Sequence, residues 1–129
     1  MLRVIYALLL ALVNWRLRMK TQEQLSKMTE QDLTFELACL VFNDCHVYTS
    51  KRGKVGVSTD TYTGYVSIND WSWLMPLFVK HGNNLRFMNN GKWSAICELE
   101  DDSFHATAEE ELQRAIAICL ILKLQEIQE

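Results

Sequence analysis

A chain of 129 residues in which 49% are hydrophobic and 22% charged has the composition of one globular domain, and it is long enough to enclose a single core. Its formal net charge at pH 7 is -3. Proteins that bind duplex nucleic acid are usually basic, because contacts to phosphates carry much of their affinity. The charge balance therefore argues against a duplex as the partner.

The first segment is apolar: residues 4–13 carry no charge and are flanked by arginines. Ten residues are too few to cross a bilayer as a helix, which takes about 20 residues. We expect residues 1–20 to be either an extra helix that packs on the domain or on a partner subunit, or a stretch upstream of a true start at Met19 or Met28. A membrane anchor is the third alternative. Residues 21–129 are expected to form the single domain.

The domain is predicted to open with a helix and a meander of strands. Acidic residues follow Thr29, which favours a helix start, and leucines recur at helical spacing up to about Phe42. Two strand-like segments come next, His46–Thr49 and Val55–Ser58, joined by a polar turn that contains glycine. Residues 62–68 are predicted to add a third strand.

A middle helix is predicted after the meander. Asn69 or Asp70 is expected to cap it, and it runs to about Lys80. Pro76 lies inside this run, where proline removes a backbone hydrogen bond and clashes with the preceding turn. The proline predicts either a kink or a short turn followed by a helix that begins near Met75.

The last third of the chain is predicted to be a hairpin and a long helix. Residues 85–88 and 92–97 flank an Asn-Gly turn, and in the pairing that we expect, Arg86 faces Lys92. Thr107 is expected to cap the final helix, with the glutamates that follow it in the first turn. The run AIAICLIL in this helix is apolar on every side. We therefore expect the helix to cross a sheet and to be covered also by the first helix or by a second subunit.

Together these elements predict a compact α+β domain. Its antiparallel sheet of two hairpins or a meander packs with an N-terminal, a middle and a long C-terminal helix. No pattern indicates catalysis: the serines lack a G-x-S-x-G setting, and the three histidines fall in separate segments. We therefore expect a protein that is not an enzyme and that carries no cofactor.

The four cysteines are expected to be free thiols in a reducing compartment. No two of them have C-x-x-C spacing. A zinc site could draw on Cys45, His46 and the distant His105, but their spacing does not match a structural zinc site. No metal site is predicted.

The aromatic-rich middle third is the candidate site, since it mixes tryptophans and tyrosines with amides and cations. Aromatic faces could hold a nucleobase, and Arg86 or Lys92 could hold a phosphate. The alternative is that most of these rings belong to the core. The basic turn 51–54 is either an exposed hairpin tip or a contact for a phosphate or an acidic partner. The predicted ligand-binding residues are Tyr65, Asn69, Trp71, Trp73, Arg86, Lys92 and Trp93.

Three segments carry a resemblance to a known family. They read TEQDLTFELA at residues 29–38, SINDWSWLMPLFVKHG at 67–82 and LQRAIAICLILK at 112–123. In combination they resemble the NinX-like proteins of tailed phages and prophages, over about residues 28–127. The resemblance implies a small accessory protein made in the cytoplasm of an infected bacterium, and it implies no particular reaction.

The function expected from these observations is a non-enzymatic binding protein, acting as a homo-oligomer, that counters host defence by capturing a small nucleotide-like signalling ligand. One alternative is an inhibitor that docks on a host defence protein through a hydrophobic patch. A further alternative is an enzyme. No membrane partner is expected, apart from the anchor considered for residues 4–13.

Overall fold

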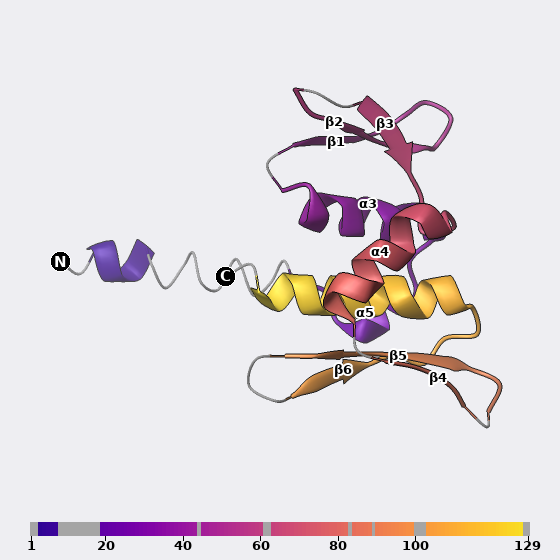
Figure 1. Cartoon of the computed structure of the whole chain (residues 1–129). Helices are drawn as coiled ribbons and strands as arrows, with labels where there is room; N and C mark the ends of the chain where they lie inside the picture. The colour runs from indigo at the N-terminus through magenta and orange to yellow at the C-terminus, as the bar shows by residue number, and fades with distance from the viewer. Residues whose placement is uncertain are drawn as a thin grey trace.

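The computed structural model describes residues 3–7, 19–43, 45–60, 63–82, 84–88, 90–99 and 103–127. Two three-stranded antiparallel sheets lie on opposite sides of a helical middle layer, as Figure 1 shows. The α+β class predicted from the sequence is confirmed, and the strands form two separate sheets.

The helical layer begins with α2 (Gln22–Ser26) and α3 (Glu30–Val41), and a threonine caps each of them. The Thr29 side chain accepts a hydrogen bond of 3.1 Å from the backbone N–H of Asp32, which satisfies one of the free N–H groups at the start of α3. The predicted helix from Thr29 is confirmed.

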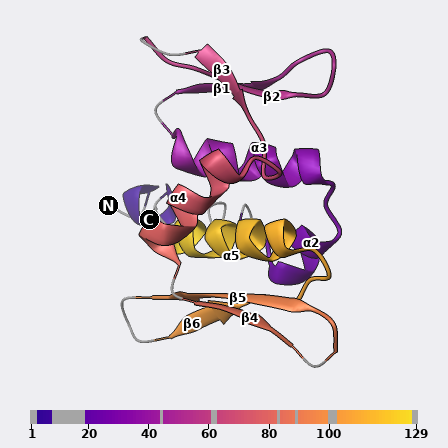
Figure 2. The same cartoon turned by 45° about the vertical axis from the view of Figure 1, so that its right-hand side comes forward.

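The first sheet has the order β1 (His46–Thr49), β2 (Val55–Ser58) and β3 (Thr63–Val66). Its inner face packs on α3 through buried valines, and Figure 2 shows this sheet above α3. Burial of branched side chains on one face of a strand and exposure on the other is what the period of two in the sequence predicts. The predicted meander is confirmed over the described part, and Tyr62 lies outside the described residues.

Helix α4 (Trp71–His81) follows the first sheet directly. The carboxylate of Asp70 caps it by accepting hydrogen bonds from the backbone N–H and the hydroxyl of Ser72. Pro76 lies inside this helix, so the predicted alternative of a short turn followed by a helix near Met75 is wrong. Trp73, on α4, packs against both hydrophobic clusters and so joins the core of the first sheet to that of the second.

The second sheet has the order β4 (Asn84–Phe87), β5 (Trp93–Glu98) and β6 (Phe104–Ala106). The predicted hairpin is confirmed, but its register pairs Arg86 with Ser94. The expected pairing of Arg86 with Lys92 is therefore wrong. The backbone carbonyl of Lys92 instead accepts the hydrogen bond from Met88 that closes the turn.

The long helix α5 (Leu112–Ile127) lies between α3 and the second sheet, as Figure 1 shows, and its side chains from Ala115 to Leu122 are all buried. It contacts α2, α3 and α4 as well as β5 and β6. The prediction that the apolar helix is covered by the first helix is therefore confirmed within a single chain.

The start of α5 differs from the prediction. Thr107 is not its cap: the Thr107 hydroxyl accepts a hydrogen bond from the backbone N–H of Ala95 and donates one to the carbonyl of Ala115. The chain stays extended beyond Thr107 because Glu109 forms a bridge with Trp93, and the helix begins only at Leu112. The glutamates therefore precede the first turn of α5.

Residues 3–7 are helical, and Val4, Ile5 and Tyr6 are exposed, so this part of the apolar segment is not buried against the domain. Residues 8–18 lie outside the described residues. None of the helices in the described ranges combines the length and the apolar character that a membrane crossing requires.

Candidate functional site

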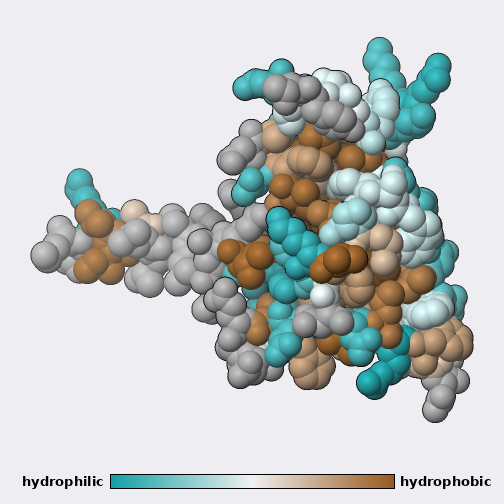
Figure 3. Space-filling model, viewed as in Figure 1, coloured by the Kyte–Doolittle hydropathy of each residue, from teal (hydrophilic) through white to brown (hydrophobic). Residues whose placement is uncertain are grey.

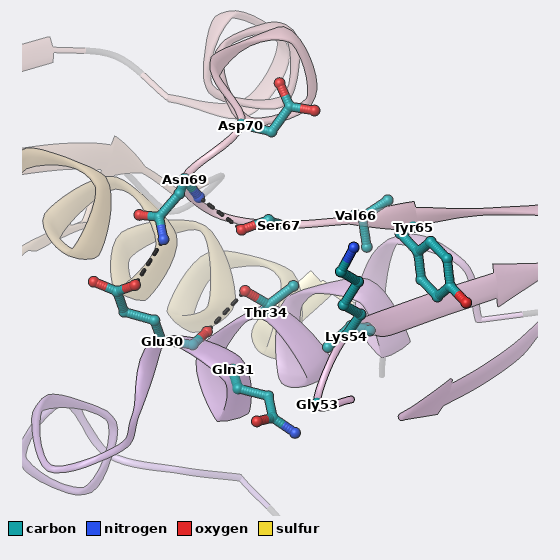
Figure 4. Close-up of a pocket in the computed structure, with 11 residues that line it drawn as sticks. Glu30, Gln31, Thr34, Gly53, Lys54, Tyr65, Val66, Ser67, Asn69 and Asp70 are labelled. Atoms are coloured by element: carbon teal, nitrogen blue, oxygen red, sulfur yellow. Dashed lines mark hydrogen bonds between the residues drawn. The ribbon is translucent and has the colours of Figure 1, made fainter. Parts of the chain in front are cut away.

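A pocket of about 390 Å³ opens between the start of α3, the β1–β2 turn and the loop from β3 to α4 (Figure 4). We call it the α3 pocket. Its volume falls in the range of about 300–1,000 Å³ that is typical of small-molecule sites. It is lined by Glu30, Gln31, Thr34, Gly53, Lys54, Val55, Tyr65, Val66, Ser67, Asn69 and Asp70.

One wall of the pocket is the turn between β1 and β2, which comes close to α3. Gly53 has φ +82°, a left-handed conformation that residues with a Cβ rarely adopt. A Cβ at this position would lie 3.2 Å from the side-chain oxygen of Gln31, so glycine also permits the close approach. The turn is closed by hydrogen bonds from the Lys54 backbone N–H to the Ser50 hydroxyl and from the Ser50 N–H to the Lys54 carbonyl.

A cation and an aromatic ring lie beside each other in this wall. The Lys54 Nζ is 5.6 Å from the centroid of the Tyr65 ring, which is within the range of a cation–π contact. Figure 4 shows the Lys54 side chain extended toward β3 beside this ring. The Tyr65 side chain is 57% exposed, so much of its surface remains open to a ligand.

The floor of the pocket is a hydrogen-bonded connection between α3 and the loop after β3. The buried Thr34 hydroxyl donates to the Glu30 carbonyl at 2.7 Å and accepts from the Ile68 N–H at 3.2 Å. The Asn69 amide donates to the Glu30 carboxylate at 2.6 Å, and Figure 4 shows this bond and the one from Thr34 to Glu30. These bonds hold Glu30 and Asn69 in place before any ligand arrives, which limits the entropy lost on binding.

A second hollow, of about 330 Å³, adjoins the α3 pocket and is lined by Ser50, Lys51, Arg52, Lys54 and Tyr65. The two hollows share Lys54 and Tyr65. Lys51 and Arg52 are exposed, and Figure 3 shows hydrophilic side chains over the first sheet. Three cations within four residues therefore line this hollow together with the exposed Tyr65 ring.

The structure places the seven predicted ligand-binding residues in different parts of the fold. Tyr65 and Asn69 lie together in the α3 pocket. Trp71 and Trp73 belong to the first turn of α4, where Trp71 is partly exposed and Trp73 packs between the two hydrophobic clusters. Neither tryptophan lines the α3 pocket.

The other three predicted residues belong to the opposite sheet. Arg86 lies on β4, Lys92 in the turn before β5, and Trp93 on β5 with its ring 4.9 Å from that of Phe87. The helical layer separates this hairpin from the first sheet (Figure 1), so the seven residues do not form one site. For the same reason, Arg86 and Lys92 do not form one patch with the basic turn 51–54.

Sequence reasoning missed Glu30 and Thr34 as parts of a site. Glu30 reads as an ordinary acid in the first turn of a helix, and 39 positions separate it from Asn69. No local pattern signals a contact over that distance. The basic turn, in contrast, is visible in the sequence, and its Gly53 and Lys54 line the α3 pocket.

Within the described ranges, no three side chains of the metal-binding kinds come together. Cys45 and His46 lie at the start of the first sheet and His105 lies on β6 of the second, where it is 2.8 Å from the Glu126 carboxylate. Comparisons with protein-family models, with curated proteins and with solved structures found no match to this chain. The resemblance to the NinX-like proteins stays a prediction.

Proposed function

We propose that this chain is a non-enzymatic binding protein that captures a small nucleotide-like ligand in the α3 pocket. One observation carries the proposal: a hollow of about 390 Å³ brings together an exposed aromatic ring, a basic turn and a fixed pair of polar side chains. Nucleotides need these three partners, since they combine a flat base with polar edges and an anionic phosphate.

The aromatic ring binds the base of the ligand, and the cations bind its phosphate. The base stacks on Tyr65, a contact worth about 1–3 kcal/mol per base. The phosphate lies against Lys51, Arg52 and Lys54, of which Arg52 can bind two phosphate oxygens at once. Lys54 lies over the ring in the free protein, and its flexible side chain can move from the ring to the phosphate when the base arrives.

The polar pair fixes the orientation of the base. The Glu30 carboxylate accepts hydrogen bonds only, so it favours a base edge that carries N–H groups. The Asn69 side chain, which donates to Glu30, holds that carboxylate at the pocket floor. A ligand without an N–H edge would leave the carboxylate desolvated and without a new partner, and it would bind more weakly.

The resemblance to phage proteins supplies the biological setting of the proposal. In the cytoplasm of an infected bacterium, a protein that captures a signalling nucleotide lowers the free concentration of that signal and so counters host defence. The same proposal includes a homo-oligomer, which light scattering on the purified chain would measure. This setting rests on the resemblance, whereas the ligand class rests on the pocket.

Calorimetry on the purified chain tests the ligand class. The panel is UMP, ADP-ribose, and cyclic di- and oligonucleotides. Tyr65→Ala is expected to weaken binding at least about 5-fold, since lost stacking amounts to about 1 kcal/mol or more. Lys54→Met is expected to weaken it about 10-fold through the lost charged contact.

The matched controls are Phe104→Ala and Lys80→Met, which remove an exposed ring and an exposed lysine far from the pocket. Both are expected to bind like the unmodified protein. Absence of heat across the whole panel at high protein concentration would remove the proposal. Equal effects of the pocket variants and the controls would show that the binding site lies elsewhere.

An inhibitor that docks on a host protein is the second candidate. Val79, Phe87 and Phe104 are 76%, 60% and 63% exposed, and exposed aromatic and aliphatic side chains are common anchors at protein interfaces. This candidate predicts that Phe87→Ala and Phe104→Ala lose a host partner in a pull-down while Tyr65→Ala keeps it. The opposite pattern would favour the α3 pocket.

A further inference from the structure

The outer face of the first sheet carries a row of aromatic side chains. Opposed residues of an antiparallel sheet point to the same side, and the register aligns Tyr48, Gly56 and Tyr65 across the three strands. The valines that pack on α3 point to the other side. Tyr48 and Tyr65 therefore flank Gly56 on the face that points away from the helical layer.

Gly56 lets the Tyr48 ring lie flat on the sheet. A Cβ on Gly56 would overlap the Tyr48 ring, so this ring occupies the space above the glycine backbone. The His46 ring, two positions earlier on the same strand, has its centroid 5.5 Å from that of Tyr48 and is tilted by only 19°. The two rings make a nearly parallel platform, with Tyr65 on the far side of Gly56.

Positive charge borders the platform. Lys51, Arg52 and Lys54 lie in the turn that joins β1 to β2, and Lys54 points to the same face as Tyr65, over whose ring it lies. In Figures 1 and 2 no described element covers this face of the sheet. The surface therefore combines flat rings, spaced across the strands, with cations at one edge.

We infer that this face binds a single-stranded oligonucleotide. The inference rests on the proposed function and names its ligand more closely: one nucleotide lies at Tyr65 and the α3 pocket, and the strand continues over Gly56 so that the next bases stack on Tyr48 and His46. Sheet-borne aromatic rings beside basic loops are the arrangement by which proteins hold unpaired bases. A duplex keeps its bases stacked inside and cannot use these rings.

The flat rings favour a nucleic acid strand over an acidic peptide. Both would contact the basic turn, but only a strand of bases offers flat partners for rings that lie parallel to the sheet. Tyr65 lines one hollow with the basic turn, and the platform follows on the other side of Gly56, so a strand with its first phosphate at Arg52 passes over Tyr65 onto the platform. The ligand therefore contains more than one base.

Fluorescence anisotropy with the full chain tests the inference. The probes are 5′-labelled uridine and thymidine oligonucleotides of one to eight nucleotides, with UMP as competitor and a labelled poly-glutamate peptide for comparison. Affinity is expected to rise from the mononucleotide to the tetranucleotide, since each stacked base adds to binding. Comparison of the uridine with the thymidine oligonucleotides shows whether the protein prefers RNA or DNA.

Variants of the platform separate this inference from the proposed function. Tyr48→Ala is expected to weaken the tetranucleotide at least about 5-fold, the equivalent of about 1 kcal/mol, and to leave UMP binding unchanged. Two further variants keep the test valid if Tyr48→Ala fails to fold. Gly56→Ala displaces the Tyr48 ring without removing it, and His46→Ala changes an exposed side chain. Phe104→Ala is the matched aromatic control.

Equal affinity for one and four nucleotides, with no effect of Tyr48→Ala or His46→Ala, would overturn the inference and leave the α3 pocket as a mononucleotide site. Poly-glutamate that binds as tightly as the tetranucleotide would also overturn it, because charge alone would then explain the binding. No binding of any oligonucleotide would overturn this inference, whereas the proposed function is lost only if the whole calorimetric panel also gives no heat.

Discussion

The Sγ atoms of Cys97 and Cys119 lie 2.7 Å apart in the core between β5 and α5, and both side chains are fully buried. The hydrogen bond to Cys97, together with burial, raises the pKa of the Cys119 thiol above its ordinary value of 9.0. The Cys119 thiol therefore keeps its proton at neutral pH and is a poor nucleophile there.

This thiol predicts a pH dependence of stability. Because the folded-state pKa of Cys119 is raised, its contribution is fully present below about pH 9 and is lost as the pH rises further. Urea unfolding at about pH 8 and about pH 10 is expected to show that the stability advantage of the unmodified protein over Cys119→Ala shrinks, by at most about 1.4 kcal/mol per pH unit. A difference that stays constant over this range would contradict the prediction.

Thr107 connects the second sheet to α5 through two buried hydrogen bonds, at 3.1 Å to the Ala95 N–H and at 3.0 Å to the Ala115 carbonyl. Thr107→Val keeps the shape and removes both bonds. We expect it to lower the free energy of unfolding by about 1–3 kcal/mol, as for other buried groups left without a partner. Thr49→Val, at an exposed position of β1, is the control and is expected to have little effect in the same denaturant titration.

His81 predicts a loss of stability in acid. Burial, followed by the charges of Lys80 and Lys123, lowers the pKa of His81 below its ordinary value of 6.5. A lowered folded-state pKa gives stability that is present above pH 6.5 and is lost as the pH falls through the lowered value. The stability of the unmodified protein is therefore expected to fall relative to that of His81→Gln on acidification.

NMR titration of the His81 ring measures its pKa directly. A value at or above the ordinary one would contradict the prediction. Stability curves of the unmodified protein and His81→Gln that stay parallel through the acid range would contradict it as well.

Gly53 and Gly91 form a matched pair for the basic turn. Both have left-handed backbones, with φ of +82° and +79°, so replacing either with alanine is expected to cost about 1–2 kcal/mol of stability. A Cβ on Gly53 also meets Gln31 at the wall of the α3 pocket, whereas a Cβ on Gly91 meets nothing within 4 Å. Gly53→Ala alone is therefore expected to weaken nucleotide binding, which the calorimetric panel measures. Equal binding by the two variants would count against a ligand at this turn.

Local signals in the sequence were sufficient to predict most elements. Thr29, Asp70 and the Asn-Gly turn mark where α3, α4 and the second hairpin begin or turn, because capping and turn chemistry involve neighbours in the chain. The apolar run in α5 likewise predicted its burial from both sides. Each of these features depends on residues that are close together in the sequence.

The site could not be predicted in the same way. Tyr65 and Asn69 were expected to share a site with Arg86 and Trp93, but the latter two belong to a sheet on the other side of the helical layer. Which hairpin packs on which helix face depends on the summed burial of many side chains. The late start of α5 has a similar cause, since the bridge between Trp93 and Glu109 overrides the local preference of Thr107 for a cap.

All three strands of the first sheet come from one unbroken stretch of chain, residues 46–66, and none of them pairs with the second sheet. The side chains on its outer face point away from the buried helices. Substitutions at these outward positions are therefore expected to leave the contacts between the helices and the second sheet in place.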